Sequence, residues 1–368
     1  MREPRAGPAA TSQSGRKGNG RTTALAARLT AQLLAGEPAR DPVAVAERLL
    51  AVQGQDPRGF RLAVRARTTG LTAADVDRSL TEERSLVVTW LNRGTLQLVR
   101  SEDYPWLHAL TAPPQARGIA RRLGQLGVSP EQADLAVATI ERSLADEGPL
   151  TRNELAGRIA AAGVPTEGQA LAYELALASL RGVCVRGPVA GRQHAWALVR
   201  DWLGEPKPVE RDRALAELAR RYLAGHGPAT DHDLARWAGL PLRDVRAGLR
   251  EIAGELAARE DGLVDLARRP PPEGIPPPRL LGAFDPVLLV WTGREELLGP
   301  HASRVVEGGM FWPFALVNGR AAGTWRLRDG EVDLEPFRRL ARPDAEALDL
   351  DSGDVVRFLT RADERAEE

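Results

Sequence analysis

The sequence predicts an α+β protein of three helical units, each ending in a β-hairpin or a short strand, followed by a small C-terminal β domain. A repeated phrase is the first observation: residues 148–156 (GPLTRNELA) return as residues 227–235 (GPATDHDLA). In each copy a threonine caps a helix and an acidic residue follows three positions later, which is the capping-box pattern. The second observation is a change of hydrophobic period from 3.6 to 2 beyond the proline runs at 270–272 and 276–278.

The first unit combines helices with one hairpin. Helical spacing of apolar residues predicts helices that begin near Thr22, Asp41, Phe60, Thr72 and Ser101. Pro57 ends the second helix and leaves Gln53 and Gln55 at or just beyond its end. Strands at 86–91 and 96–99 flank the turn 92–95 and form a hairpin in the position of a wing.

The later units repeat this plan. Helices are predicted from Ser129, Thr151 and Thr166, then a second hairpin at 183–186 and 193–198. Further helices begin at Arg211, Thr230 and Leu242, before a short strand at 263–266. Asn-Gly and Asp-Gly turns then separate three strands at 314–317, 321–328 and 331–334. The predicted divisions are a disordered tail (1–20), three units (21–112, 113–205 and 206–272), a β domain (273–345) and a C-terminal tail (346–368).

Composition limits the classes of partner. The chain has 368 residues, of which 43% are hydrophobic, and its 50 basic and 50 acidic residues cancel. A nucleic-acid site must therefore be a local patch, because proteins that coat DNA are basic overall. Cys184 is the only cysteine and the histidines lack ligand spacing, so we expect neither disulfide, metal nor cofactor. Without a membrane-length apolar run or a signal-peptide h-region, we expect a cytoplasmic protein that does not bind membranes.

The repeated helix–turn–helix skeleton makes DNA the first partner to consider. The helix before a wing usually enters the major groove, but the one at 166–180 carries Glu167 and Glu174 and no basic residue. Arg243, Arg246 and Arg250 form a stripe that a solvated helix face explains equally well. The hairpins offer better candidates, and the C-terminal one could enter a minor groove. The candidate DNA-binding residues are Arg93, Arg186, Arg192, His194, Asn318, Arg320 and Arg326.

Seven segments carry a resemblance to a known family, in matching order and spacing: 51–56, 89–99, 148–152, 186–188, 221–230, 283–285 and 317–320. Together they resemble the winged-helix DNA glycosylases of the AlkZ type and the wider group of YcaQ-like proteins. The resemblance implies three tandem winged-helix units and a small β-barrel in a C-shaped body that holds double-stranded DNA. It also implies removal of N7-alkylguanine and unhooking of interstrand cross-links, as self-resistance in a bacterium that makes a DNA-alkylating natural product. The family's Gln–aliphatic–Gln catalytic signature falls on Gln53 and Gln55.

The chain departs from the family at three positions near this signature. Gly54 replaces the aliphatic residue, Asn92 stands where methionine is expected, and Gln97 stands where histidine is expected. Roles at the last two positions are therefore not carried over. A further departure follows Asp285, where residues 286–291 (PVLLVW) replace the acidic and aromatic segment that the family usually has, so contacts from that strand are not carried over either. No lysine is placed for Schiff-base chemistry, so we expect a monomeric, monofunctional enzyme that leaves an abasic site.

Two amides suffice for this chemistry because N7-alkylguanine is already a cationic leaving group. A glutamine carbonyl can accept a hydrogen bond from the attacking water and present partial negative charge to the sugar. Asp56 is a rival catalyst because a carboxylate is the conventional general base, but its place before Pro57 is explained by a turn or cap.

Two other classes of protein fit parts of the sequence. A non-catalytic winged-helix regulator would explain the repeats and hairpins and would leave the glutamines structural. A toxin-sequestering protein could line its pocket with tryptophans such as Trp90 and Trp196.

Overall fold

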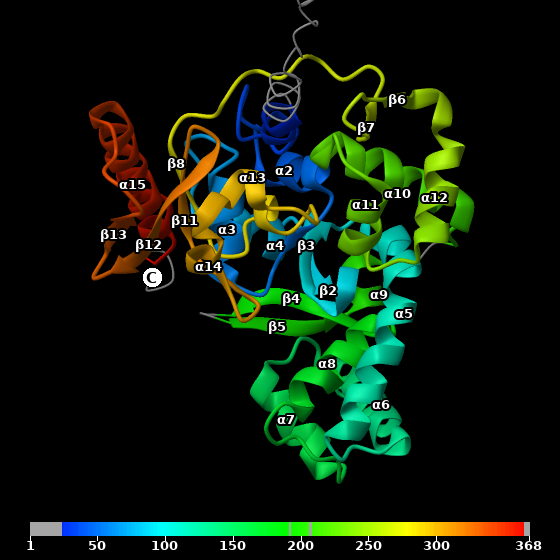
Figure 1. The fold of residues 1–368 in the computed structure, drawn as a ribbon. Coiled ribbons are helices and arrows are strands. Elements are labelled where there is room, and N and C mark those ends of the chain that lie inside the picture. The colour runs from blue at the N-terminus through cyan, green and yellow to red at the C-terminus, as the bar shows by residue number, and fades with distance from the viewer. Residues whose placement is uncertain (1–23, 191–192, 206–207, 364–368) are drawn as a thin grey trace, which may run out of the picture.

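The computed structural model describes residues 24–190, 193–205 and 208–363. Helices surround two larger antiparallel sheets, so the predicted mixture of helices and sheets is confirmed (Figure 1). The predicted disordered tail (1–20) and Arg192 lie outside the described residues. The number of winged-helix units and the C-shape stay predictions.

Two of the N-terminal helices begin at predicted caps, whereas another begins at Pro57 and not at the predicted Phe60. Residues 24–31 are helical. The carboxylate of Asp41 accepts a hydrogen bond from Ala44 N at 2.7 Å and caps the next helix. Thr72 and Asp75 form a capping box at the start of another. The bounds are α2 Pro42–Leu49, α3 Pro57–Arg65 and α4 Ala73–Thr81.

The chain between α2 and α3 differs from the prediction. It forms strand β1 (Val52–Gln53), so Gln53 does not lie at a helix end. Pro57 does not end α2 but is the first residue of α3, whose N-cap is Asp56. The Asp56 carboxylate accepts a hydrogen bond from Arg58 N at 3.1 Å, and proline at N1 lacks only an N–H that would have no helical partner. Capping therefore explains Asp56.

Both predicted hairpins belong to one five-stranded sheet. Its order is β1-β3-β2-β4-β5, and β2 meets β4 where Val88 pairs with Arg186. Val87 and Val99 pack into one hydrophobic core, whereas Val88 and Leu98 pack into another. This burial on both faces explains the continuous apolar run of β2. The bounds are β2 Leu86–Trp90, β3 Leu96–Arg100, β4 Cys184–Ala190 and β5 Gln193–Leu198, with the turn η1 Asn92–Gly94.

The predicted boundary at 112/113 falls inside a helix. Helix α5 (Tyr104–Gln125) follows Asp103, not Ser101, and continues through Pro113 and Pro114. Proline costs a helix interior about 3 kcal/mol. Burial of apolar side chains on both sides of the prolines offsets this cost, so two prolines do not mark a unit boundary here.

The next helices begin at or near predicted positions. Ser129 and Thr151 cap α6 (Pro130–Glu147) and α7 (Arg152–Ala161), but α8 (Ala170–Leu180) begins later than the predicted Thr166. Glu174 does not face DNA from α8, because its side chain is buried without a hydrogen-bond partner among the described residues. Burial raises its pKa to about 7.

The third helical group follows the predicted order. Thr230 caps its helix through a capping box with Asp233. The strand predicted at 263–266 pairs with a preceding strand that the sequence did not indicate. The bounds are α9 Val199–Leu203, α10 Arg211–His226, α11 Asp231–Ala238, α12 Leu242–Glu251, η2 Ala253–Glu255, β6 Leu256–Ala258 and β7 Val264–Leu266.

The C-terminal β domain is an open sheet, so the expected barrel is wrong for the described residues. The predicted three-stranded meander is confirmed, and a fourth short strand gives the order β13-β12-β11-β8. Four strands with a three-residue edge strand are too few to close around a core. The bounds are β8 Arg279–Leu281, η3 Pro286–Leu288, α13 Glu295–Leu298, η4 Gly299–His301, α14 Ala302–Val305, β9 Val306–Glu307, β10 Met310–Phe311, β11 Phe314–Val317, β12 Arg320–Arg328 and β13 Glu331–Pro336.

The predicted C-terminal tail is instead helix α15 (Arg342–Asp363), drawn in red beside the open sheet in Figure 1. Leu348, Val355 and Phe358 are buried against the core that includes β8. Arg65 Nε donates to Asp354 Oδ2 at 2.8 Å and ties the helix to α3. Long-range packing therefore orders most of the segment that the sequence analysis assigned to a tail.

Two further features limit the kind of site to expect. Among the residues that the structure describes, no helix combines the length and apolarity that a membrane crossing requires. Within this part of the chain, His, Cys, Asp and Glu side chains form no group of three or more that could hold a metal ion.

Candidate active site

Gln53 lies in a polar row that crosses three strands. It pairs with Gln97 on β3, which pairs in turn with Thr89 on β2. Directly paired residues project from the same face of a sheet, so these three side chains share the face of Val87 and Val99. That face is otherwise apolar at this point. A row of buried polar side chains costs desolvation, which is typical of a functional site rather than of a core.

An arginine fixes the Gln53 amide. Arg93 Nη2 donates to Gln53 Oε1 at 3.2 Å, and Gln53 is only 8% exposed. Because arginine has donors and no acceptor, the amide oxygen must face Arg93 and the NH₂ group must point elsewhere. Arg93 has a φ of 57°, a left-handed conformation that costs a non-glycine residue about 1 kcal/mol. Strain of this kind clusters at functional sites.

Gly54 is held tightly between the two glutamines. Its N–H donates to Leu96 O at 2.7 Å and extends the pairing of β1. A Cβ built on Gly54 would lie 3.2 Å from Val88 Cγ1, which is tighter than ordinary packing. Val88 thus occupies the space that the family's aliphatic residue would need. Gln55 follows in the bend before α3, and its side chain is exposed.

The two other family departures are also buried. Gln97 Nε2 donates to Thr95 Oγ1 at 2.6 Å, so it is held in the hairpin rather than free. Asn92 is 1% exposed, and neither its Nδ2 nor its Oδ1 has a hydrogen-bond partner among the described residues. An unpaired buried amide is unfavourable by about 1–3 kcal/mol. Asn92 immediately precedes Arg93, so this unfavourable buried amide lies beside the candidate site.

A network of buried hydrogen bonds holds the segment that precedes β1. Arg67 and Asp285 are fully buried and form two hydrogen bonds of 2.9 Å. Arg67 also donates to Gln32 Oε1 at 3.0 Å, and Gln32 Nε2 lies 2.7 Å from His226 Nδ1. His226 Nε2 lies 3.0 Å from Leu49 O.

The chain of bonds fixes the state of the histidine. Burial lowers the pKa of His226 to about 3, so the ring is neutral at neutral pH. Nδ1 accepts from the Gln32 amide, which leaves the proton on Nε2, where it is donated to Leu49 O. Leu49 ends α2 and leads into β1, so the network holds the approach to Gln53.

The segment that follows Asp285 contacts side chains from several other parts of the chain. It forms the turn η3 rather than a strand. Its carbonyl groups accept from the side chains of three residues: Leu288 from Arg294, Leu289 from Arg93 at 3.3 Å, and Val290 from Tyr222 at 2.7 Å. These contacts could not be predicted from the departure of this segment from the family sequence.

Arg186 and His194 do not form an exposed hairpin tip. The Arg186 guanidinium carbon lies 5.9 Å from the Trp90 ring and 5.7 Å from the Trp196 ring, and these rings stack with centroids 5.4 Å apart. Burial, with the nearby charge of Arg152, lowers the pKa of Arg186 to about 10. Burial, followed by the charges of Arg186 and Arg61, lowers the pKa of His194 to about 4. Arg186 on β4 is therefore a half-buried cation, and His194 on β5 is a buried, neutral ring.

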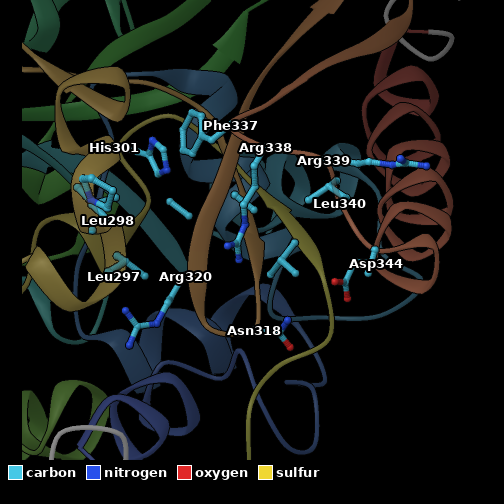
Figure 2. Close-up of a pocket in the computed structure, with 16 residues that line it drawn as sticks. Leu297, Leu298, His301, Asn318, Arg320, Phe337, Arg338, Arg339, Leu340 and Asp344 are labelled. Atoms are coloured by element: carbon cyan, nitrogen blue, oxygen red, sulfur yellow. The ribbon is translucent and has the colours of Figure 1, made fainter. Parts of the chain in front are cut away.

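Asn318 and Arg320 border a cavity of about 600 Å³ at the C-terminal sheet. Figure 2 shows their side chains near Arg338 and the stacked His301–Phe337 pair, whose ring centroids are 4.4 Å apart. The turn between β11 and β12 packs against Leu29, because a Cβ on Gly319 would lie 3.0 Å from its Cδ1. Asn318 and Arg320 are nevertheless exposed, so entry of this turn into a minor groove stays a prediction.

The predicted site residues thus fall into separate groups. Among the predicted DNA-binding residues that the structure describes, only Arg93 forms a hydrogen bond with a predicted catalytic residue. Arg326 lies exposed on β12, where it pairs with Asp333 of β13. Sequence reasoning missed Gln32, Arg67, Arg236 and Arg294. The sequence contains little indication of them, because each residue comes from a different segment and only contacts in the folded structure place it near the site.

Comparisons with known proteins agree with this architecture. A family model described as "DNA glycosylase AlkZ-like" matches residues 46–358. The curated "Interstrand DNA cross-link repair glycosylase" of Streptomyces sahachiroi is 29% identical over 361 residues, which cover 87% of this chain and 92% of that protein. The solved structure of Streptomyces sahachiroi DNA glycosylase AlkZ superposes with a TM-score of 0.73 at 28% identity, covering 91% of this chain and 95% of that one.

Proposed function

The chain belongs to the AlkZ-like DNA glycosylase family, and on this premise we propose that it hydrolyses the N-glycosidic bond of N7-alkylguanine in double-stranded DNA. By the same reaction it unhooks interstrand cross-links, as the name of its Streptomyces relative suggests. Its role is self-resistance to a DNA-alkylating natural product. The observation that carries the proposal is the Gln53 amide, oriented by Arg93 in a polar row next to the exposed Gln55.

The proposed division of labour follows from exposure. Gln55 is solvent-exposed, so its carbonyl accepts a hydrogen bond from the attacking water. Gln53 is held by Arg93, so its NH₂ group presents fixed donors to the DNA backbone or to the same water. Positioning and electrostatics of this kind lower a barrier by several kcal/mol.

In the proposed step the water oxygen bonds to C1′ of the damaged nucleotide while the C1′–N9 bond breaks. The electron pair of that bond moves to the alkylated base and cancels its positive charge. The water releases its proton to solvent, and the products are free alkylguanine and an abasic site. Neutral amides are weak bases, so undamaged purines, which need protonation to leave, are spared.

The proposal is tested with a duplex that carries one N7-methylguanine, followed by alkaline cleavage of abasic sites. The wild type should produce scission at the lesion, and Gln53→Ala and Gln55→Ala should not. Gln125→Ala is the matched control, because Gln125 is an exposed glutamine at the end of α5. A second duplex with an interstrand cross-link tests unhooking. Scission by the two variants at the wild-type rate would remove the assigned roles.

A further inference from the structure

Three arginines from separate segments converge beside Gln53. Arg93 lies in η1, Arg236 lies in α11, and Arg294 immediately precedes α13. Helices α11 and α13 are labelled in Figure 1. The segment 288–292 connects all three, because Arg294 donates to Leu288 O, Arg93 donates to Leu289 O at 3.3 Å, and Arg236 donates to Thr292 O at 3.4 Å. One short stretch of backbone thus gathers three guanidinium groups.

The end of α11 packs directly on the Arg93 backbone. Gly239 caps α11 with a φ of 70°, and a Cβ at this position would lie 2.9 Å from Arg93 N. A side chain here would clash and would also be strained, so glycine permits the approach. Arg236 lies in the last turn of the same helix. The close contact therefore brings Arg236 and Arg93 to one place.

None of the three arginines forms an ion pair in the described part of the chain, where several other arginines pair with glutamate side chains. Glu295 is the acidic neighbour whose charge acts on Arg294. Burial, followed by the charges of Arg236 and Arg294, lowers the pKa of Arg93. Arg236 is exposed, so the cluster is open to solvent.

We propose that Arg93, Arg236 and Arg294 bind one phosphodiester of the DNA strand that carries the damaged nucleotide. Arginine forks match phosphate oxygens, and three like charges held together without a carboxylate favour an anion between them. The site touches Gln53 through Arg93, so the bound phosphate lies next to the reacting sugar. Its negative charge also stabilises the positive charge that develops on that sugar. This inference rests on the proposed glycosylase function and adds a site to it.

The test replaces single phosphodiesters around an N7-methylguanine with uncharged methylphosphonates, one linkage at a time in each strand. In wild-type protein, one linkage of the damaged strand should lower DNA affinity or the single-turnover rate about tenfold when neutralised. In Arg236→Ala and Arg294→Ala the same replacement should have a clearly smaller effect, because one of the three arginines that bind the phosphate is already missing. Each variant should also reduce the slope of log affinity against log salt by about 1.

Two results would overturn the phosphate site. In the first, neutralising each linkage has the same effect in both variants as in the wild type. In the second, the only linkage whose effect is smaller in the variants lies in the undamaged strand. Arg342→Ala is the control, because Arg342 is exposed and already paired with Glu346 on α15. Arg236→Lys keeps the positive charge at an exposed position. A loss of affinity seen in Arg236→Ala but not in Arg236→Lys is therefore due to the charge and not to misfolding. Affinity is measured even if the wild type cuts nothing, so failure of the adduct assignment and failure of the phosphate site are distinguishable.

Discussion

Arg93 Nη2 donates to Gln53 Oε1 at 3.2 Å across a separation of 40 residues. The bond joins the turn of one hairpin to the first strand of the sheet, and it decides which end of the Gln53 amide points away from Arg93. A glutamine that is free to rotate would offer oxygen and nitrogen alternately. The orientation of the amide is therefore a property of the pair, not of Gln53 alone.

Replacing Arg93 should impair catalysis more than folding. In Arg93→Ala the Gln53 carbonyl loses its donor, and the single-turnover excision rate at saturating DNA should fall about tenfold to a hundredfold. Arg93→Lys should recover only part of the rate, because an ammonium cannot contact Gln53 and Leu289 as a fork does. Quench-flow or manual time courses with labelled duplex measure this. An unchanged rate in Arg93→Ala would show that the contact has no catalytic role.

Restoring a side chain at position 54 should be unfavourable unless Val88 gives way. Gly54→Ala places a methyl group 3.2 Å from Val88 Cγ1 and should lower the free energy of unfolding by about 1 kcal/mol. Val88→Ala alone should also lose stability, because it leaves a cavity in the core, and the double variant should lose less than the sum of the two single losses. Urea titrations of the two single variants and the double variant form the cycle. Additive losses in the double variant would contradict the proposed contact.

The buried Arg67–Asp285 pair should be costly to break at one end. Asp285→Ala leaves an uncompensated charge and should lower the free energy of unfolding by about 3–5 kcal/mol. The double replacement Arg67→Met/Asp285→Ala should lose less than Asp285→Ala. Denaturant unfolding measures both. If the double variant were less stable than the single one, the pair would not be the source of the cost.

Stability should fall in mild acid because two histidines stay neutral in the fold. The pKa of His226 is lowered from 6.5 to about 3 and that of His194 to about 4. Below pH 6.5 the unfolded chain binds protons that the folded chain does not, so these groups contribute no pH dependence above 6.5 and destabilise the fold progressively below it. Each contributes a slope of about 1.4 kcal/mol per pH unit. Urea midpoints between pH 4.5 and 6.5 should change less steeply in His194→Gln than in wild type, and equal slopes would refute the assignment.

Local signals in the sequence predicted local structure well. Caps at Asp41, Ser129, Thr151 and Thr230 were predicted correctly because an N-cap side chain acts within three residues of itself. The Asn-Gly and Asp-Gly turns likewise predicted the C-terminal meander. Each of these features depends on neighbours in the chain, so a single sequence contains the information.

Features that depend on distant contacts were missed. The pairing of β2 with β4 joins strands almost a hundred residues apart, and α15 is ordered by β8 and α3. The C-terminal sheet is open, so the expected barrel was wrong. Turn signals in the sequence predict hairpins, but closure of a sheet depends on the number of strands and on their edges. Arg236 and Arg294 could not be singled out, since only the folded segment 288–292 brings them to Arg93. The two glutamines came from family resemblance, not from their spacing.

The central claim is that Gln53 and Gln55 promote release of an N7-alkylated base. The most direct measurement is mass spectrometry of the free base after single-turnover incubation with duplexes that contain or lack N7-methylguanine. The account predicts that the wild type releases 7-methylguanine and no normal purine, and that Gln53→Ala and Gln55→Ala bind the duplex but release almost none. Release by both variants at the wild-type rate, or binding by the wild type without any release, would contradict it.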